Sequence, residues 1–257
     1  MAGDHHTKLS RREALALLAA GPGLLLLRSG PLRAAGASGP ADADPDWSSR
    51  NWGYAIDPAK CIGCGACVRA CRAENHVPVG RFRTWVERYH VLRSGEVHVD
   101  VAPGPNHVFT ADVGVPREEI VKAFFVPKLC NHCERSVCSQ VCPVGATYTS
   151  PDGVVLVDSK HCIGCGYCVQ ACPYGTRFIN PETHVADKCT LCYHRIRHGL
   201  QPACVQACPT GARLFGDLND PHGMLTTVLS QRRYRVLKPE MGTHPKCFYL
   251  GLDREVV

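Results

Sequence analysis

The chain has 257 residues, 45% of them hydrophobic, and a formal net charge of +6. This length allows one or two compact domains. Five basic and two acidic residues lie in the first 37 positions, and the charge that remains gives no electrostatic case for binding nucleic acid. The chain also lacks a phosphate-binding glycine loop, a dinucleotide fingerprint and a nucleophile elbow, so no substrate chemistry of those classes is indicated.

The N-terminus has the pattern of an export signal. Ser10-Arg11-Arg12 precedes an Ala- and Leu-rich stretch at 14–27, and Ala35-Gly36-Ala37 offers a small-residue cleavage site. Paired arginines before a modestly apolar run resemble a twin-arginine signal, although Ala14 stands where that motif usually has phenylalanine. We therefore predict a signal peptide over 1–37. The alternative is a chance arginine pair before a disordered arm.

The next segments contain a linker and several strands. Residues 38–50 are rich in Ala, Gly, Pro, Ser and Asp, which is typical of a linker. The segment 52–57 alternates like a short strand that leads to the first cysteines. The segments 83–92 and 96–101, joined across Ser94-Gly95, predict an antiparallel hairpin.

The second half of the chain predicts another hairpin and a basic helix. Pro151-Asp152-Gly153 forms a turn signal within the β-prone stretch 146–158. The stretch 191–198 is basic and has a helical pattern. After Cys208 no run of eighteen apolar residues follows, so we expect no C-terminal membrane anchor.

Sixteen of the seventeen cysteines fall into four groups of four, each ending in a C-x3-C step. The groups are I (Cys61, Cys64, Cys67, Cys71), II (Cys130, Cys133, Cys138, Cys142), III (Cys162, Cys165, Cys168, Cys172) and IV (Cys189, Cys192, Cys204, Cys208). Groups I and III have the spacing of bacterial ferredoxins. The segments 60–71 and 161–172 agree at nine of twelve positions, which indicates duplication of a ferredoxin half.

This spacing suits cubane iron–sulfur clusters. A C-x2-C-x2-C loop can place three thiolates around one cluster, and Gly63, Gly65, Gly164 and Gly166 relieve crowding where the backbone approaches it. The fourth cysteine stands one helical turn further on, so it points away from its own loop and ligates the other cluster of a pair. We therefore predict four 4Fe-4S clusters and little stable fold without metal.

Other uses of the cysteines are less favoured. Zinc ribbons need two C-x2-C pairs per metal, and disulfide frameworks do not have regular tetrads with C-P endings. No C-x-x-C step is followed by histidine, so covalent haem attachment is excluded. Cys247 stands alone and is expected to be a buried small hydrophobe. His132 is not expected to be a ligand, because group II already has four cysteines.

The motifs together resemble one known family. They read C-I-G-C-G-A-C-V-R-A-C at 61–71, C-N-H-C-E-R-S-V-C-S-Q-V-C-P at 130–143, C-I-G-C-G-Y-C-V-Q-A-C-P-Y-G at 162–175, C-T-L-C at 189–192 and C-V-Q-A-C-P-T-G-A at 204–212. Over about residues 52–215 the chain resembles the four-cluster iron–sulfur subunits of the dimethyl sulfoxide reductase superfamily. One departure is Arg72, which follows Cys71 where the other groups have proline.

The resemblance implies that group I exchanges its last ligand with group IV, and group II with group III. The implied ligand sets are Cys61, Cys64, Cys67 and Cys208; Cys189, Cys192, Cys204 and Cys71; Cys130, Cys133, Cys138 and Cys172; and Cys162, Cys165, Cys168 and Cys142. All sixteen cysteines are present, so the resemblance implies four 4Fe-4S clusters and no 3Fe-4S centre.

The implied fold class is α+β, with duplicated bacterial ferredoxin-like modules that form two interleaved two-cluster domains and carry a β-hairpin insertion. One module comprises 51–75 and 185–215, and the other comprises 126–184. The insertion covers 76–125, and a C-terminal extension covers 216–257.

The resemblance also implies a function. We expect an electron-transfer subunit without catalytic residues of its own, working between a membrane-integral quinone-reactive subunit and a catalytic subunit, either a molybdopterin enzyme or a multihaem cytochrome. We expect the protein in the periplasm, exported in a folded state and held to the membrane through a partner. The alternatives are a freestanding periplasmic multicluster ferredoxin and a zinc-stabilised binding module. The sequence does not indicate the terminal substrate, the direction of electron flow or the cluster potentials.

Overall fold

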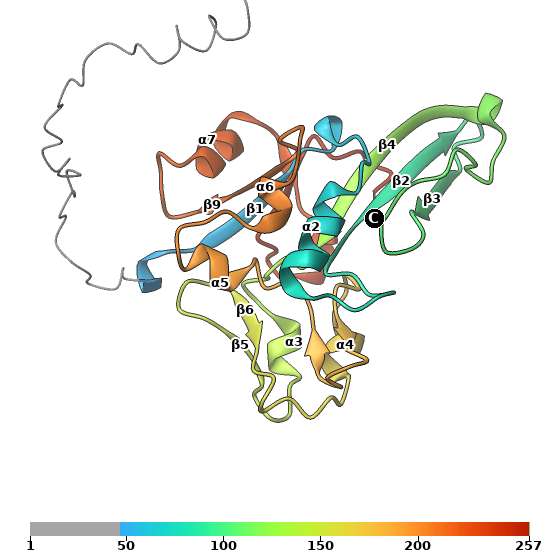
Figure 1. Cartoon of the computed structure of the whole chain (residues 1–257). Coiled ribbons are helices and arrows are strands. Elements are labelled where there is room, and N and C mark those ends of the chain that lie inside the picture. Colours follow the sequence, from blue (N-terminus) through green and yellow to red (C-terminus); the bar gives the residue numbers. More distant parts are fainter. Residues whose placement is uncertain (1–46, 257) are drawn as a thin grey trace, which may run out of the picture. The chain divides into compact units, whose positions relative to one another are not determined.

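A computed structural model describes residues 47–256, so the predicted signal peptide and residues 38–46 of the predicted linker lie outside the described part. Short helices alternate with small sheets along the chain (Figure 1). The helices are α2 (Ala66–Asn75), α3 (Val137–Gln140), α4 (Tyr167–Gln170), α5 (Tyr193–Ile196), α6 (Ala203–Gln206) and α7 (Met224–Gln231). Short 3-10 turns occupy Trp47–Ser49, Pro58–Lys60, Arg117–Glu119 and Pro239–Met241.

The strands are grouped in four sheets. They are β1 (Trp52–Ile56), β2 (Thr84–Leu92), β3 (Val97–Val101), β4 (Ile120–Leu129), β5 (Thr147–Thr149), β6 (Val155–Val157), β7 (Phe178–Ile179), β8 (Ala186–Asp187), β9 (Arg213–Asp217), β10 (Tyr234–Arg235) and β11 (Cys247–Leu250). The sheet orders are β10-β11-β1-β9, β3-β2-β4, β5-β6 and β7-β8. This mixture of helices and small sheets is compatible with the predicted α+β class.

Four of the strand pairings follow one rule. The strand that follows one cysteine group pairs antiparallel with the strand that precedes the next group. Thus β2, after group I, pairs with β4, which ends directly before group II. In the same way β5 pairs with β6 between groups II and III, and β7 pairs with β8 between groups III and IV. The last strand, β9, returns to pair with β1, which precedes group I. Each cysteine loop is therefore fixed at both ends by a sheet.

The two predicted antiparallel pairings are present. Strand β2 pairs with β3 from Glu87↔Val101 to Val91↔Val97, and β5 pairs with β6 across the Pro-Asp-Gly turn. A further strand, β4, lies beside β2 and has no counterpart among the predicted strands. Its residue Pro127 removes an N–H from the ladder, and this is tolerated because β4 lies at the edge of its sheet.

The predicted basic helix over 191–198 is shorter in the structure. Only the single turn α5 is helical, because Leu191 and Cys192 before it have left-handed φ angles of 54° and 51°. These two backbone conformations serve the cysteine loop and delay the start of the helix.

The C-terminal extension forms part of the central sheet. Strand β11 pairs parallel with β1 and antiparallel with β10, and α7 packs near β9. The Tyr249 hydroxyl on β11 donates a 3.0 Å hydrogen bond to the Pro127 carbonyl of β4. The extension therefore joins the sheet of β1 to the sheet of β2, a role that no motif in its sequence indicates.

A buried carboxylate connects the β5–β6 turn to β1. Asp152 is fully buried, and its side chain accepts hydrogen bonds from the Trp52 indole N–H at 2.9 Å, from Ser150 at 2.5 Å and from the Tyr193 hydroxyl at 3.3 Å. Trp52 in turn stacks on Phe215, with the ring centroids 4.9 Å apart. The turn motif predicted Asp152 only as a turn residue, yet the carboxylate also satisfies donors from two distant segments.

We expect Asp152→Ala to lower the free energy of unfolding by about 2–4 kcal/mol, because buried donors would lose their acceptor. Asp158→Ala is the matched control, since that aspartate lies on the same hairpin with its side chain partly exposed. Anaerobic denaturant unfolding of the holoprotein, followed by circular dichroism and by the visible absorption of the clusters, measures both. Equal losses for the two variants would contradict the role assigned to Asp152.

Candidate iron–sulfur sites

Each cysteine loop contains a left-handed residue at the same place. The residue before the second cysteine of each group has a positive φ, and these residues are Gly63 (68°), His132 (43°), Gly164 (70°) and Leu191 (54°). A Cβ on Gly63 would lie 2.4 Å from the Phe125 ring, and one on Gly164 would lie 2.3 Å from the His184 carbonyl oxygen. Gly63 and Gly164 are therefore required by the φ angle and by neighbouring protein atoms, whereas a Cβ on Gly166 would meet no atom within 4 Å. Groups II and IV adopt the same turn with buried non-glycine side chains.

The third cysteine of each group lies on a short helix. Helix α2 carries Cys67 and Cys71, while α3, α4 and α6 carry Cys138, Cys168 and Cys204. In groups II, III and IV one residue separates the end of the helical turn from the fourth cysteine. Helix α2 packs against α6, and α3 packs against α4, as the ribbon also shows (Figure 1). The helices of groups I and IV are thus neighbours, and so are those of groups II and III.

Thiols of groups I and IV share neighbours. The Asn75 amide nitrogen lies 3.7 Å from the Cys71 sulfur and 3.5 Å from the Cys192 sulfur. Burial raises the pKa of Cys71, and the nearby thiolates of Cys204 and Cys192 raise it further. Cys71 of group I therefore lies close to Cys192 and Cys204 of group IV.

The Cys61 thiol of group I lies near thiols of both group I and group IV. Burial raises the pKa of Cys61 to about 11, and the thiolates of Cys67 and Cys208 contribute to the increase. The last cysteine of group IV therefore lies near the triplet of group I.

Thiols of groups II and III also lie close together. A cavity is lined by Cys130, Cys133 and Cys138 of group II together with Cys172, the last cysteine of group III. Burial raises the pKa of Cys133 to about 12, with contributions from the other three thiolates. Fewer interactions connect the thiols of the fourth ligand set, which comprises Cys162, Cys165, Cys168 and Cys142. Burial raises the pKa of Cys168, and Cys162 is among the neighbouring thiolates.

Cys142 has a different environment. Burial raises the pKa of this thiol, but the backbone N–H groups of Thr147, Val144 and Ala146 outweigh burial and lower it below its ordinary value. These N–H groups favour the thiolate form, which is the form that binds iron.

Other hydrogen-bond donors point at the sulfur atoms. The backbone N–H groups of Leu191 and Ala186 donate to Cys189 at 3.3 Å and to Cys162 at 3.4 Å. The Tyr54 hydroxyl lies 3.3 Å from the sulfur of Cys204. Hydrogen bonds to sulfur are among the features that set the potential of an iron–sulfur cluster.

Two buried arginines lie beside the thiols at equivalent positions. The segments C-P-Y-G-T-R at 172–177 and C-P-T-G-A-R at 208–213 both end in arginine. Arg213 is buried and donates to the Tyr54 hydroxyl at 3.3 Å and to Thr84 Oγ1 at 2.8 Å. Burial would lower its pKa, but the thiolates of Cys67 and Cys204 help to raise it. Sequence reasoning missed these arginines, although the repeated hexapeptide was a signal for them.

Arg177 shows that the site fits an anionic group. Its side chain lines the cavity of groups II and III, and Nη1 donates to Thr147 Oγ1 at 3.3 Å. Its Nε and Nη2 atoms are buried and have no hydrogen-bond partner within residues 47–256. Buried donors require acceptors. Thiolate and sulfide atoms of a cluster held by the surrounding cysteines would supply them, so the residues present fit a 4Fe-4S cluster.

The remaining cysteine observations concern the alternatives. None of the seventeen cysteines, all of which lie within the described residues, forms a disulfide bond. Cys247 is fully buried on β11, as predicted, and burial raises its pKa to about 12. Within residues 47–256, no three His, Cys, Asp or Glu side chains form a group that could hold a single metal ion.

Comparison with known proteins identifies the cofactor and the family. Two models described as 4Fe-4S dicluster domains match residues 60–146 and 121–218. A subunit of the tetrathionate reductase of Salmonella typhimurium is 45% identical over 77% of this chain and 71% of its own length. A chain of the polysulfide reductase of Wolinella succinogenes is 36% identical over 80% and 97%, and protein NrfC of Escherichia coli is 39% identical over 77% and 79%.

Two dicluster domains give four 4Fe-4S clusters, in agreement with the sixteen grouped cysteines. The zinc alternative is therefore wrong. The 4Fe-4S dicluster domains and the likeness to these reductase subunits make the protein an electron-transfer component of a reductase complex. The chain belongs to the family of iron–sulfur subunits found with reductases of the dimethyl sulfoxide reductase superfamily.

Proposed function

We propose that this subunit relays electrons between a membrane-integral quinone-reactive subunit and a catalytic subunit, either a molybdopterin enzyme or a multihaem cytochrome, in a periplasmic respiratory complex. The observation that carries the proposal is the exposure of one cysteine loop in each pair of groups. Cys64 of group I and Cys165 of group III are the two exposed cysteines of the chain. Electrons must enter and leave where a partner can approach a cluster.

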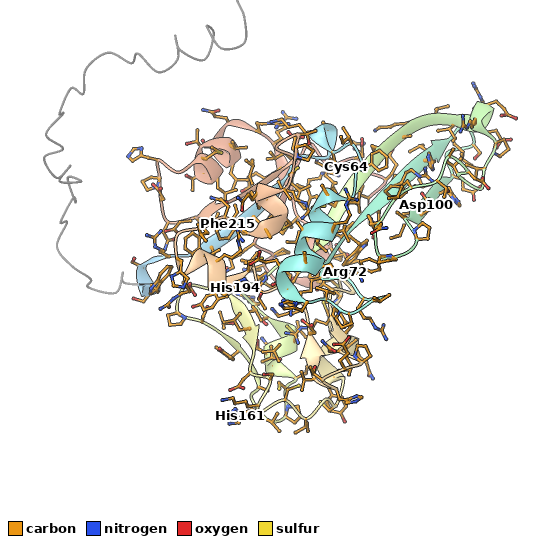
Figure 2. All side chains as sticks on the ribbon, in the orientation of Figure 1. Cys64, Arg72, Asp100, His161, His194 and Phe215 are labelled. Atoms are coloured by element: carbon orange, nitrogen blue, oxygen red, sulfur yellow. The ribbon has the colours of Figure 1, made fainter. Side chains whose placement is uncertain are left out.

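The two exposed loops lie far apart. In the view with side chains drawn, Cys64 lies in the upper half of the molecule, and His161, the residue before group III, lies at its lower end (Figure 2). Each loop also presents an apolar side chain to solvent, since Ile62 is 59% exposed and Ile163 is 65% exposed. Exposed apolar residues beside a redox centre suit docking of a protein partner. Two separate loops suit two different partners.

For the clusters themselves, we propose two interleaved pairs. The ligand sets are the four implied by the resemblance, with Cys71 and Cys208 exchanged between groups I and IV, and Cys142 and Cys172 exchanged between groups II and III. The packing of α2 on α6 and of α3 on α4 supports the exchange. So do the amide of Asn75 between Cys71 and Cys192 and the cavity that Cys172 shares with group II.

For location, we propose twin-arginine export and attachment through a partner. No helix within residues 47–256 is long and apolar enough to cross a membrane. The proposed signal contains Arg11 and Arg12 and lies outside the described residues. Export after folding fits a protein whose clusters must be inserted before its thiols meet an oxidising compartment.

The exchange of ligands predicts which centre each substitution affects. Cys208→Ser should alter the same electron paramagnetic resonance signal as Cys61→Ser, because both cysteines would bind one cluster. Cys204→Ser is the matched control, since it lies one helical turn before Cys208 and should alter a different signal. If Cys204→Ser and Cys208→Ser instead altered one common signal, the exchange would be ruled out.

The two exposed loops predict separate defects in electron transfer. Ile62→Glu and Ile163→Glu should each leave all four clusters intact, and one of them should slow cluster reduction by quinol in membranes while the other slows re-oxidation by the catalytic subunit. Stopped-flow absorption of the membrane-bound complex measures both steps. Val79→Glu is the control, because Val79 is 77% exposed and lies outside the cysteine loops. Unchanged rates in both isoleucine variants would argue against the relay.

The export signal is tested by substituting Arg11→Lys and Arg12→Lys together. The protein should then accumulate in the cytoplasm with its clusters present, because only the targeting motif changes. Cell fractionation with iron and acid-labile sulfide analysis gives the result, and the single substitution Arg28→Lys serves as a control within the same segment. Normal delivery of the double variant to the periplasm would refute the export route without affecting the electron-transfer assignment.

A further inference from the structure

Lys188 is a buried cation next to a cysteine loop. It follows β8 and directly precedes Cys189, the first cysteine of group IV, and only 1% of its surface is exposed. Its Nζ donates to the carbonyl oxygen of Cys189 at 2.9 Å and to that of Val155 on β6. The lysine therefore lies between the start of group IV and the strand that precedes group III.

No carboxylate within residues 47–256 forms an ion pair with this ammonium. The adjacent carboxylate, Asp187, pairs with Arg83 at 2.8 Å instead. The amine has carbonyl oxygens as its hydrogen-bond partners, and an ammonium group donates three hydrogen bonds and accepts none. A buried charge without a counter-ion is costly, so something anionic must compensate it.

Burial lowers the pKa of the Lys188 ammonium, and thiolates from two different cysteine groups oppose this decrease. Those that act on the Lys188 ammonium are Cys130 and Cys138 of group II and Cys189 of group IV. Cys130 and Cys189 also act on one another, so the two loops approach each other here. The guanidinium of Arg177 also acts on Lys188 and lowers its pKa further.

His132 of the group II loop contacts Val155, the same residue that Lys188 contacts. Its Nδ1 accepts a 3.1 Å hydrogen bond from the backbone N–H of Val155, while Lys188 binds the carbonyl of that residue. Val155 is thus held from one side by group II and from the other by the start of group IV. This arrangement fixes the ammonium group between the two loops.

The two buried arginines each act on thiolates of a single pair of cysteine groups. Arg213 acts on Cys67 and Cys204, which belong to groups I and IV. Arg177 acts on Cys138, Cys130 and Cys168, which belong to groups II and III. Each arginine therefore serves one pair of groups, whereas Lys188 acts across the two pairs.

We propose that Lys188 is a positioning residue for electron transfer between the two pairs of clusters. The positive charge of its ammonium form favours the reduced state of the cluster held by the group II triplet and of the cluster held by the group IV triplet. When an electron crosses, one of these centres is oxidised as the other is reduced, and no bond forms or breaks. A charge shared by both centres raises the potentials of both. This inference rests on the proposed relay, which passes through both centres.

The test compares three variants by redox titration of the anaerobically purified holoprotein, followed by electron paramagnetic resonance. Lys188→Gln keeps hydrogen-bond donors but removes the charge, and Lys188→Arg keeps the charge. Lys60→Gln is the matched control, because Lys60 directly precedes Cys61 in the same way but is exposed to solvent. Cys133→Ser and Cys192→Ser mark the signals of the two centres concerned.

In Lys188→Gln we expect the equilibrium constant for one-electron reduction to fall at least tenfold at both marked centres, which is about 59 mV each. The other two centres should shift less, and Lys188→Arg and Lys60→Gln should titrate like the wild type. A shift at one centre only, an equal shift at all four, or the same shift in Lys188→Arg would overturn the proposal.

Loss of clusters from the Lys188 variants would also test the proposal. Loss of the two marked clusters in Lys188→Gln but not in Lys188→Arg would support a requirement for the charge. Loss in both variants would show that Lys188 acts through packing, and would overturn the proposal. The titration needs no partner, so it can succeed even if the quinol experiment shows that the proposed relay is wrong.

Discussion

The structure depends on the position of the fourth cysteine in each group. Three thiolates can be gathered by one short loop, but the C-x3-C step carries the next thiol one helical turn beyond it. That thiol can bind a cluster only if a second cysteine loop lies beside the helix. The packing of α2 on α6 and of α3 on α4 provides such neighbours. Because groups I and IV are distant in sequence, the chain must close on itself, and the pairing of β9 with β1 closes it.

The strand pairing follows from the same constraint. Each loop approaches its cluster along a left-handed turn that would not be stable alone, and the paired strands on either side hold its ends. The C-terminal strands reinforce the closure, since β11 lies beside β1 and Tyr249 contacts β4. Buried cations complete the arrangement. Each cluster with four thiolates carries about −2 charges, and the low dielectric of the interior strengthens its interaction with a nearby cation. Arg177, Arg213 and Lys188 lie within reach of the thiolates and are buried with them.

The sequence predicted the features that depend on local pattern. Cysteine spacing predicted four clusters, the Pro-Asp-Gly turn predicted the β5–β6 hairpin, and alternation predicted β1 and the pairing of β2 with β3. Features that depend on distant contacts were not predictable from pattern. Asp152 looked like an ordinary turn residue because its partner Trp52 is a hundred positions away. Lys188 looked like any lysine before a cysteine, as Lys60 does, and only burial distinguishes the two.

The central claim is that each pair of groups exchanges its last cysteine. The most direct measurement is an anomalous difference map, collected at the iron absorption edge from crystals of the holoprotein grown without oxygen. We expect four separate iron peaks, with the Cys208 sulfur bound to the peak of Cys61, Cys64 and Cys67, and the Cys71 sulfur bound to the peak of Cys189, Cys192 and Cys204. Four peaks that are each surrounded by the cysteines of a single group, or fewer than four peaks, would contradict it.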